Sequence, residues 1–287
     1  EIDPVYAGLG IVVIFLMYFL GGMRWQSVIR ALDGPRGLGK PLSFFWTGAA
    51  FGQVLPASVG GDALRVWLAW RSGFGVRLSI NSVLIERSLV FAVLVIMVLL
   101  VAPFWKDRIG PLIPVWVPVV VGLGAGLGFL LLVSADRFYR LLPRLGWLQN
   151  LVTISVDMRR CLSSPRLMLS VILNSVANYL IVVLSAWLFA KSVSMQAGFL
   201  DCLLLIPPVL LMSSLPISFA GWGVREGAMV ILLGALANDP TNALLVSILL
   251  GLGSIVTSLP GLVIWLATAP RGARVGRVSE IRETPGS

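Results

Sequence analysis

The chain has 287 residues, of which 57% are hydrophobic and 12% are charged. A soluble globular domain carries roughly 25% charged residues, so this composition excludes a soluble protein and indicates one that crosses a membrane several times. The formal net charge is +9. Nucleic acid is not expected as a partner, because Lys and Arg lie mostly in short segments between apolar runs, as is typical of cytoplasmic loops.

Histidine is absent, and the chain has 2 cysteines. Without histidine, His-dependent catalytic triads and most zinc sites are excluded, and we expect no metal and no cofactor. Cys161 and Cys202 form no CxxC pair, so we expect ordinary unpaired thiols. Residue 1 is Glu rather than Met, and we expect the native start to lie upstream.

Residues 5–23 are the first apolar run, close to the roughly 20 residues that span a hydrocarbon core. Arg24 follows directly and is expected to be an interfacial anchor, and basic residues up to Lys40 place the next loop in the cytoplasm. Residues 41–54 and 63–70 are two apolar arms separated by Pro and Gly. At about 1.5 Å per residue neither arm crosses the core, so they predict a re-entrant hairpin that enters from the cytoplasm and returns there.

Residues 79–102 are predicted to cross outward, residues 103–111 to form an outer loop, and residues 114–133 to cross back. Glycine occupies every second position from 122 to 128, which we expect to mean loose packing of this span or close approach of a neighbouring helix. Residues 134–166 are the most basic segment of the chain. They are expected to lie in the cytoplasm, with an amphipathic helix near the lipid headgroups.

Residues 167–190 are predicted to cross outward again. A second broken apolar element, residues 197–237, would enter and return on the outer side, and residues 242–269 would cross inward to a cytoplasmic tail. Asn81, Asn174 and Asn178 fall on or near the spans. We expect these asparagines to bond to neighbouring helices rather than to a ligand.

The two breaks share a motif. Residues 55–65 read LPASVGGDALR and residues 215–226 read LPISFAGWGVRE, so that Leu, Pro, Ser, Gly and Arg recur at a displacement of 160 positions. The same displacement maps span 5–23 onto 167–190 and span 79–102 onto 242–262. One extra crossing between the halves would invert the second half, as in many secondary transporters whose substrate site lies at the repeat interface.

We therefore predict an all-α polytopic membrane protein with a single transmembrane domain, residues 1–287. It would be an inverted repeat of two halves, about 5–112 and 167–270, each with a broken, re-entrant helical hairpin. A connecting span at about 113–134 and a cytoplasmic basic segment at about 135–166 would join them, and residues 271–287 would form the tail.

Charged residues within apolar spans cost about 2.5–3.5 kcal/mol each even on lenient insertion scales, so they indicate a function. A half-helix starting at each break would point free N–H groups at the middle of the membrane beside Arg65 or Arg225, which suits an anion such as phosphate. Glycines in the breaks would let the backbone approach that anion. The predicted substrate-binding residues are Arg65, Arg225, Glu226, Glu86, Arg87, Asp62, Ser58, Gly60, Gly61, Ser218, Gly221 and Gly223, with no catalytic and no metal-binding residue.

The alternative is that these charges pair with one another and hold the hairpins in place. Arg65 would then pair with Asp62 or Glu86, and Arg225 with Glu226. For Arg87, a structural pair or snorkelling toward the cytoplasm competes with substrate contact.

The LPxSxGGDxxR stretch, the run NSVLIER at residues 81–87 and the later LPISFAGWGVREG resemble a flippase-like membrane family that includes the transmembrane domain of lysylphosphatidylglycerol synthases. The resemblance implies lipid translocation, with phospholipids, lipid-linked sugars or other polyprenyl and hopanoid lipids as substrate classes among relatives. The motif match carries this role to Arg65, Glu86, Arg87, Arg225 and Glu226. The resemblance also implies one more span before residue 5.

The leading expectation is a non-enzymatic lipid translocase that moves an anionic phospholipid or polyprenyl-linked lipid across the bacterial inner membrane, with membrane lipids as its partners. Lipid aminoacylation by this chain is not expected, because no soluble transfer domain follows Pro270. One alternative is an intramembrane lipid transferase with Glu86 or Glu226 as base. The other is a membrane subunit that recruits a glycosyltransferase or another lipid-modifying enzyme through its basic segment. A homo-oligomer is a further possible partner.

Overall fold

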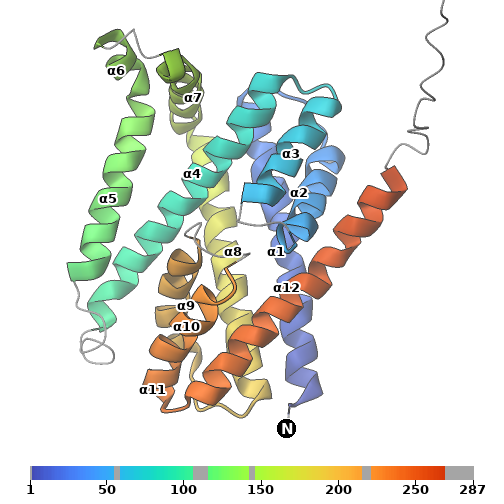
Figure 1. The fold of residues 1–287 in the computed structure, drawn as a ribbon, viewed down its shortest axis with the longest axis vertical. Helices are drawn as coiled ribbons and strands as arrows, with labels where there is room; N and C mark the ends of the chain where they lie inside the picture. Colours follow the sequence, from blue (N-terminus) through green and yellow to red (C-terminus); the bar gives the residue numbers. More distant parts are fainter. Residues whose placement is uncertain (1, 55–58, 106–115, 142–145, 215–220, 269–287) are drawn as a thin grey trace, which may run out of the picture.

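Four long apolar helices run through the structure, a computed structural model that describes residues 2–54, 59–105, 116–141, 146–214 and 221–268. They are α1 (Pro4–Ala31), α4 (Val76–Val101, continued by the 3-10 turn η1, Ala102–Trp105), α8 (Pro165–Ser192) and α12 (Pro240–Thr268). At 1.5 Å per residue each helix is about 39–43 Å long, which exceeds the roughly 30 Å hydrocarbon core. The described residues form helices and no strand (Figure 1), which confirms the prediction of an all-α, multi-pass membrane protein.

Helices α1 and α8 pack against each other in opposite directions. Each begins with a proline in its first turn, preceded by a capping Asp3 or Ser164 side chain, as helix starts favour. Hydrogen bonds join the pair along its length: Asp3 N to Ser192 O at 2.8 Å, Ser185 Oγ to Gly10 O at 3.2 Å, Asn178 Nδ2 to Met17 O at 2.9 Å, and Ser27 Oγ with Ser170 Oγ at 3.3 Å. The predicted interhelical role of Asn178 is therefore confirmed, whereas Asn174 bonds within its own helix.

Two groups of short helices lie at opposite ends of the bundle (Figure 1). Helices α2 (Gly39–Gly52) and α3 (Val59–Arg71) lie beside the turn into α4, at what we call the α3–α4 end. The second group, at what we call the α11–α12 end, comprises α9 (Phe199–Ser213), α10 (Val224–Met229), the π-helical segment η2 (Val230–Gly234) and α11 (Ala235–Ala237). Residues 55–58 and 215–220, and with them Ser58 and Ser218, lie outside the described residues.

Helix α2 of the first half docks on α12 of the second. Trp46 Nε1 donates to Thr257 O at 2.9 Å, and Thr47 Oγ1 donates to Gly261 O at 3.2 Å. A Cβ on Gly261 would lie less than 3.0 Å from the backbone of residues 46 and 47. A glycine is therefore required at this crossing, because neither backbone can move aside cheaply.

Helices α5 (Trp116–Val133), α6 (Ala135–Leu141) and α7 (Gly146–Leu162) connect the halves. Helix α5 lies within the predicted connecting span at one side of the bundle (Figure 1). Gly122 packs against Leu99 of α4, whereas a Cβ on Gly124, Gly126 or Gly128 would meet no atom within 4 Å. This agrees with the predicted loose packing of the glycine series.

Helix α7 is joined by ion pairs to three neighbouring segments at the α3–α4 end. Arg160 pairs with Asp33 after α1, Asp157 with Arg77 at the start of α4, and Arg159 with Asp136 of α6. Asn81 also donates to Asp157 at 2.6 Å, so its predicted interhelical bond is confirmed. The hydrogen bond from Arg159 lowers the pKa of the Asp136 carboxyl to about 2, and burial raises the pKa of the α7 thiol Cys161 to about 11.

Candidate functional site

Five charged side chains from three helices form one connected group, which we call the Glu86 cluster. It contains Arg24 of α1, Asp62 and Arg65 of α3, and Glu86 and Arg87 of α4. Arg24 Nη2 lies 2.7 Å from Glu86 Oε1, and Arg65 Nη2 lies 3.2 Å from Glu86 Oε2. Asp62 then links Arg65, whose Nη1 is 2.9 Å away, to Arg87, whose Nε is 2.5 Å away.

The depth of the Glu86 cluster follows from its place along the helices. Glu86 comes ten residues after the start of α4 at Val76, which corresponds to about 15 Å of helix. Helix α4 is about 9 Å longer than the roughly 30 Å hydrocarbon core, so Glu86 lies inside the core even if all of that excess precedes it. The cluster therefore lies within the membrane-spanning part of the protein, where charged groups persist only when paired or used.

Arg65 is the most enclosed of the three arginines, with a side chain that is 2% exposed. Its guanidinium carbon lies 4.4 Å from the ring centre of Trp25 and 4.6 Å from that of Phe45, so both rings contribute cation–π attraction. Its Nε has no hydrogen-bond partner in the structure. Arg87, in contrast, has a half-exposed side chain.

Close approach of α2 and α3 places Arg65. A Cβ on Gly48 would lie less than 3.0 Å from Arg65 Cγ and from the Gly61 carbonyl oxygen, and a Cβ on Gly61 would collide with the Gly48 carbonyl. Gly61 allows two helices to touch, and the expectation that it lets the backbone approach an anion stays a prediction. Gly60 lies in the first turn of α3 and is partly buried.

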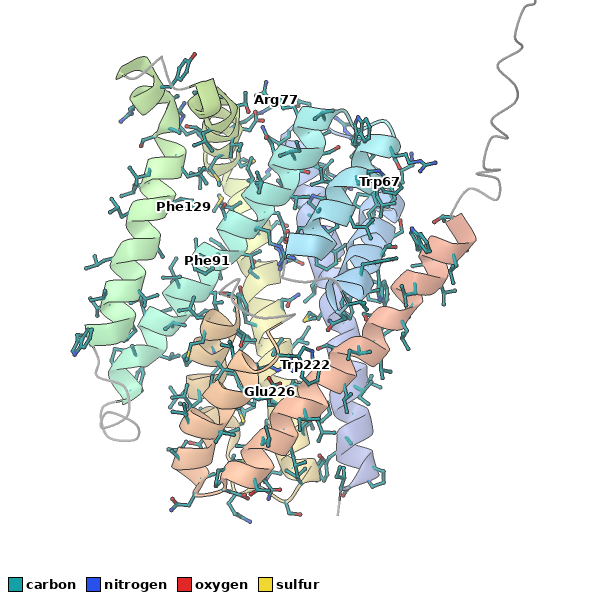
Figure 2. The ribbon with its side chains drawn as sticks, viewed as in Figure 1. Trp67, Arg77, Phe91, Phe129, Trp222 and Glu226 are labelled. Carbon is teal, nitrogen blue, oxygen red and sulfur yellow. The ribbon has the colours of Figure 1, made fainter. Side chains whose placement is uncertain are left out.

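A second, smaller group lies where α10 begins, and we call it the Arg225 cluster. Arg225 Nη2 is 2.8 Å from Glu226 Oε1, and Ser247 of α12 donates to the same oxygen at 3.2 Å. The Trp222 ring centre lies 4.9 Å from the Arg225 guanidinium carbon. Figure 2 shows Trp222 and Glu226 at the start of α10, near α12.

Backbone geometry explains the glycines of the second break. Gly221 has a φ of 82° and Gly223 a φ of 85°, a region that side chains disfavour. Gly223 N donates to Glu226 Oε2 at the first turn of α10. Glu226 is thus both the partner of Arg225 and the cap of its own helix. Across the cluster, a Cβ on Gly251 of α12 would lie less than 3.0 Å from Arg225 Nη2 and the Trp222 ring.

The structure assembles the predicted charged residues into two groups. Asp62, Arg65, Glu86 and Arg87 meet in one, and Arg225 and Glu226 meet in the other. The alternative expectation, that these charges pair with one another, is therefore confirmed as a description of their contacts. Among the described residues, no hydrogen bond or ion pair joins the two groups.

Arg24 and Ser247 are members of the clusters that the sequence did not reveal. Arg24 was expected to be an interfacial anchor, and this was wrong: the residue is 4% exposed and binds Glu86. The apolar run ends at Met23, but α1 continues to Ala31. The helical spacing of the buried Trp25, Val28 and Ile29 was the signal that α1 extends past Arg24.

The family model described as the lysylphosphatidylglycerol synthase TM region matches residues 1–261. The chain belongs to this family. Membership of this family connects the protein to membrane lipids, and it confirms the resemblance carried by the two break motifs. No curated protein and no solved structure matches the chain.

Proposed function

We propose that this member of the lysylphosphatidylglycerol synthase TM family translocates an anionic lipid across the bacterial inner membrane. The observation that carries the proposal is the position of Asp62, whose carboxylate lies between the guanidinium groups of Arg65 and Arg87. Two arginines that share one carboxylate can equally share a phosphate, because both anions accept paired N–H donors. A lipid phosphate would displace Asp62 and take its place.

An inverted repeat with two re-entrant hairpins would give the lipid access from either side. The antiparallel α1 and α8, equivalent under the motif displacement, support this architecture. So does the placement of α2 and α3 at one end of the bundle and of α9 to α11 at the other. In this scheme the Glu86 cluster receives the phosphate from one leaflet and the Arg225 cluster from the other.

The distribution of charge supports an orientation with the α3–α4 end in the cytoplasm. Basic residues lie there at the ends of α1, α3 and α7 and at the starts of α2, α4 and α8. They are Arg30, Lys40, Arg71, Arg77, Arg159, Arg160 and Arg166. At the α11–α12 end Lys191 is accompanied by Asp3, Asp201 and Asp239. Because excess Lys and Arg favours the cytoplasmic side, we propose that this end of the bundle faces the cytoplasm.

Translocation without chemistry is the form of the function that we propose. Glu86 and Glu226 each accept hydrogen bonds from arginine, whereas a general base needs to face the proton that it abstracts. Recruitment of a lipid-modifying enzyme, or assembly with a second copy, would add to translocation and does not replace it.

Purified protein in liposomes tests the proposal. Acyl-labelled lipid that moves between leaflets without chemical change supports translocation. A modified lipid would instead support a transferase. If the labelled lipid is neither moved nor modified, a recruiting subunit is the remaining alternative. Arg87→Gln should abolish most transport because it removes one of the two arginines that hold the phosphate. Arg71→Gln is the matched control, since Arg71 ends α3 and stacks on Trp67.

A further inference from the structure

Arg24 belongs to neither hairpin, yet both its Nε and its Nη2 bind Glu86, at 2.8 and 2.7 Å. The motif that predicts the site does not include it. We propose that Arg24 sets the net charge of the Glu86 cluster and thereby makes the site selective for lipids with a net negative headgroup. This inference rests on the proposed function and adds to it the residue that determines which headgroup charge is accepted.

The argument begins with the order of charges in the cluster. They alternate along one connected path that starts and ends with arginine: Arg24, Glu86, Arg65, Asp62, Arg87. Three guanidinium groups face two carboxylates, so the cluster carries one positive charge in excess. The Arg225 cluster, with one arginine and one glutamate, is neutral among its described members.

Arg24 is the origin of the excess, because it occupies a carboxylate that would otherwise neutralise the rest. Glu86 binds Arg24 through Oε1 and Arg65 through Oε2. If Arg24 were neutral, Glu86 and Asp62 would balance Arg65 and Arg87 one to one.

The excess charge is accessible at only one member of the cluster. The side chains of Arg24 and Arg65 are 5% and 2% exposed, whereas that of Arg87 is 50% exposed. A charge at this depth that lacks a counterion is costly. The half-exposed Arg87, at the end of the path, is therefore where an anion from outside the protein would bind.

The single excess positive charge of the Glu86 cluster discriminates between headgroups. A lipid with a single phosphodiester and no amine brings one negative charge and makes the occupied cluster neutral. A zwitterionic lipid brings no net charge, so its ammonium group remains uncompensated beside the arginines. At an effective dielectric constant of about 20, a unit charge on the headgroup roughly 8 Å from the excess charge of the cluster changes the binding affinity by more than about tenfold. We therefore expect at least about tenfold preference for the monoanionic lipid.

The experiment compares acyl-labelled phosphatidylglycerol and phosphatidylethanolamine in the same proteoliposomes and reports the ratio of their transport rates. Arg24→Gln makes the cluster neutral and should lower this ratio about tenfold. The double variant Arg24→Gln with Glu86→Gln returns the net charge to one and should restore the ratio. Arg24→Lys keeps the charge and should keep the ratio. Arg36→Gln, an exposed arginine outside the cluster, is the control for a general loss of positive charge.

A purely structural role for Arg24 gives a different pattern. If Arg24 only ties α1 to α4, removal of both partners should not restore selectivity, and that result in folded protein would overturn the proposal. An unchanged ratio in Arg24→Gln would do the same. Asp62→Asn provides a second route should Arg24→Gln not fold: it raises the net charge to two and should increase the preference for phosphatidylglycerol, and an unchanged or lower ratio contradicts the inference.

Binding separates this inference from the proposed function. Thermal stabilisation of the detergent-solubilised protein by each lipid can be measured without transport. If the wild-type protein transports neither lipid, translocation is wrong. Preferential stabilisation by phosphatidylglycerol that depends on Arg24 would still support the charge-setting role, and equal stabilisation by both lipids would refute it.

Discussion

Gly251 offers a way to disturb the Arg225 cluster without changing any charged group. A methyl group at this position would lie less than 3.0 Å from Arg225 Nη2 and from two carbons of the Trp222 ring, whereas ordinary contact begins at 3.4 Å. In Gly251→Ala the arginine and the tryptophan must therefore move by about 0.5–1 Å. Because a hydrogen bond to a charged group is worth about 1.5–3 kcal/mol and is weakened when the guanidinium moves, we expect roughly 10- to 100-fold slower transport of labelled lipid in proteoliposomes.

The stability of the protein should change little in this variant. The atoms that must move are the ends of flexible side chains rather than backbone. Gly227→Ala is the matched control, because a Cβ there meets no atom within 4 Å although Gly227 follows Glu226 directly. Equal transport rates for Gly251→Ala and Gly227→Ala, with both proteins eluting as single species, would refute a role for the position of Arg225.

Three further predictions concern single side chains. Glu86→Gln leaves two buried arginines short of a carboxylate and should destabilise the protein by about 3–5 kcal/mol, measured by denaturation in detergent. Asp136→Asn should lower stability at neutral pH. Because Arg159 lowers the pKa of Asp136 from 3.8 to about 2, its stabilisation is complete above pH 4 and is lost as the pH falls toward 2, so wild type and variant should converge there. Cys161, in a Cys202→Ser background, should react with maleimide far more slowly in the folded than in the unfolded protein at neutral pH, because the folded thiol is buried and its pKa is raised to about 11; equal rates would contradict the structure.

Sequence patterns predicted the elements of this protein better than the contacts between them. Hydropathy placed all four long helices, because a span must be apolar over its whole length. Contacts between residues close in the sequence could also be predicted. Arg225 and Glu226 are adjacent, and Asp62 and Arg65 are three residues apart.

Contacts between distant residues depend on how helices rotate and cross, which periodicity does not encode. Arg24 and Glu86 are 62 positions apart, and Ser247 follows Glu226 by 21. The contact of Gly61 with Gly48 on the preceding helix was missed for the same reason. Arg24 was misread because the end of an apolar run is not the end of a helix.

The pairing of Arg24 with Glu86 also constrains how the chain enters the membrane during synthesis. Arg24 leaves the ribosome 62 residues before its carboxylate partner, so α1 meets the lipid with an uncompensated guanidinium group. The helix has 28 residues and is about 42 Å long, which is roughly 12 Å more than the hydrocarbon core. Arg24 precedes the end of α1 by seven residues, or about 10 Å. Helix α1 is therefore long enough for this arginine to lie at the headgroups until α4 has been synthesised and Glu86 is available.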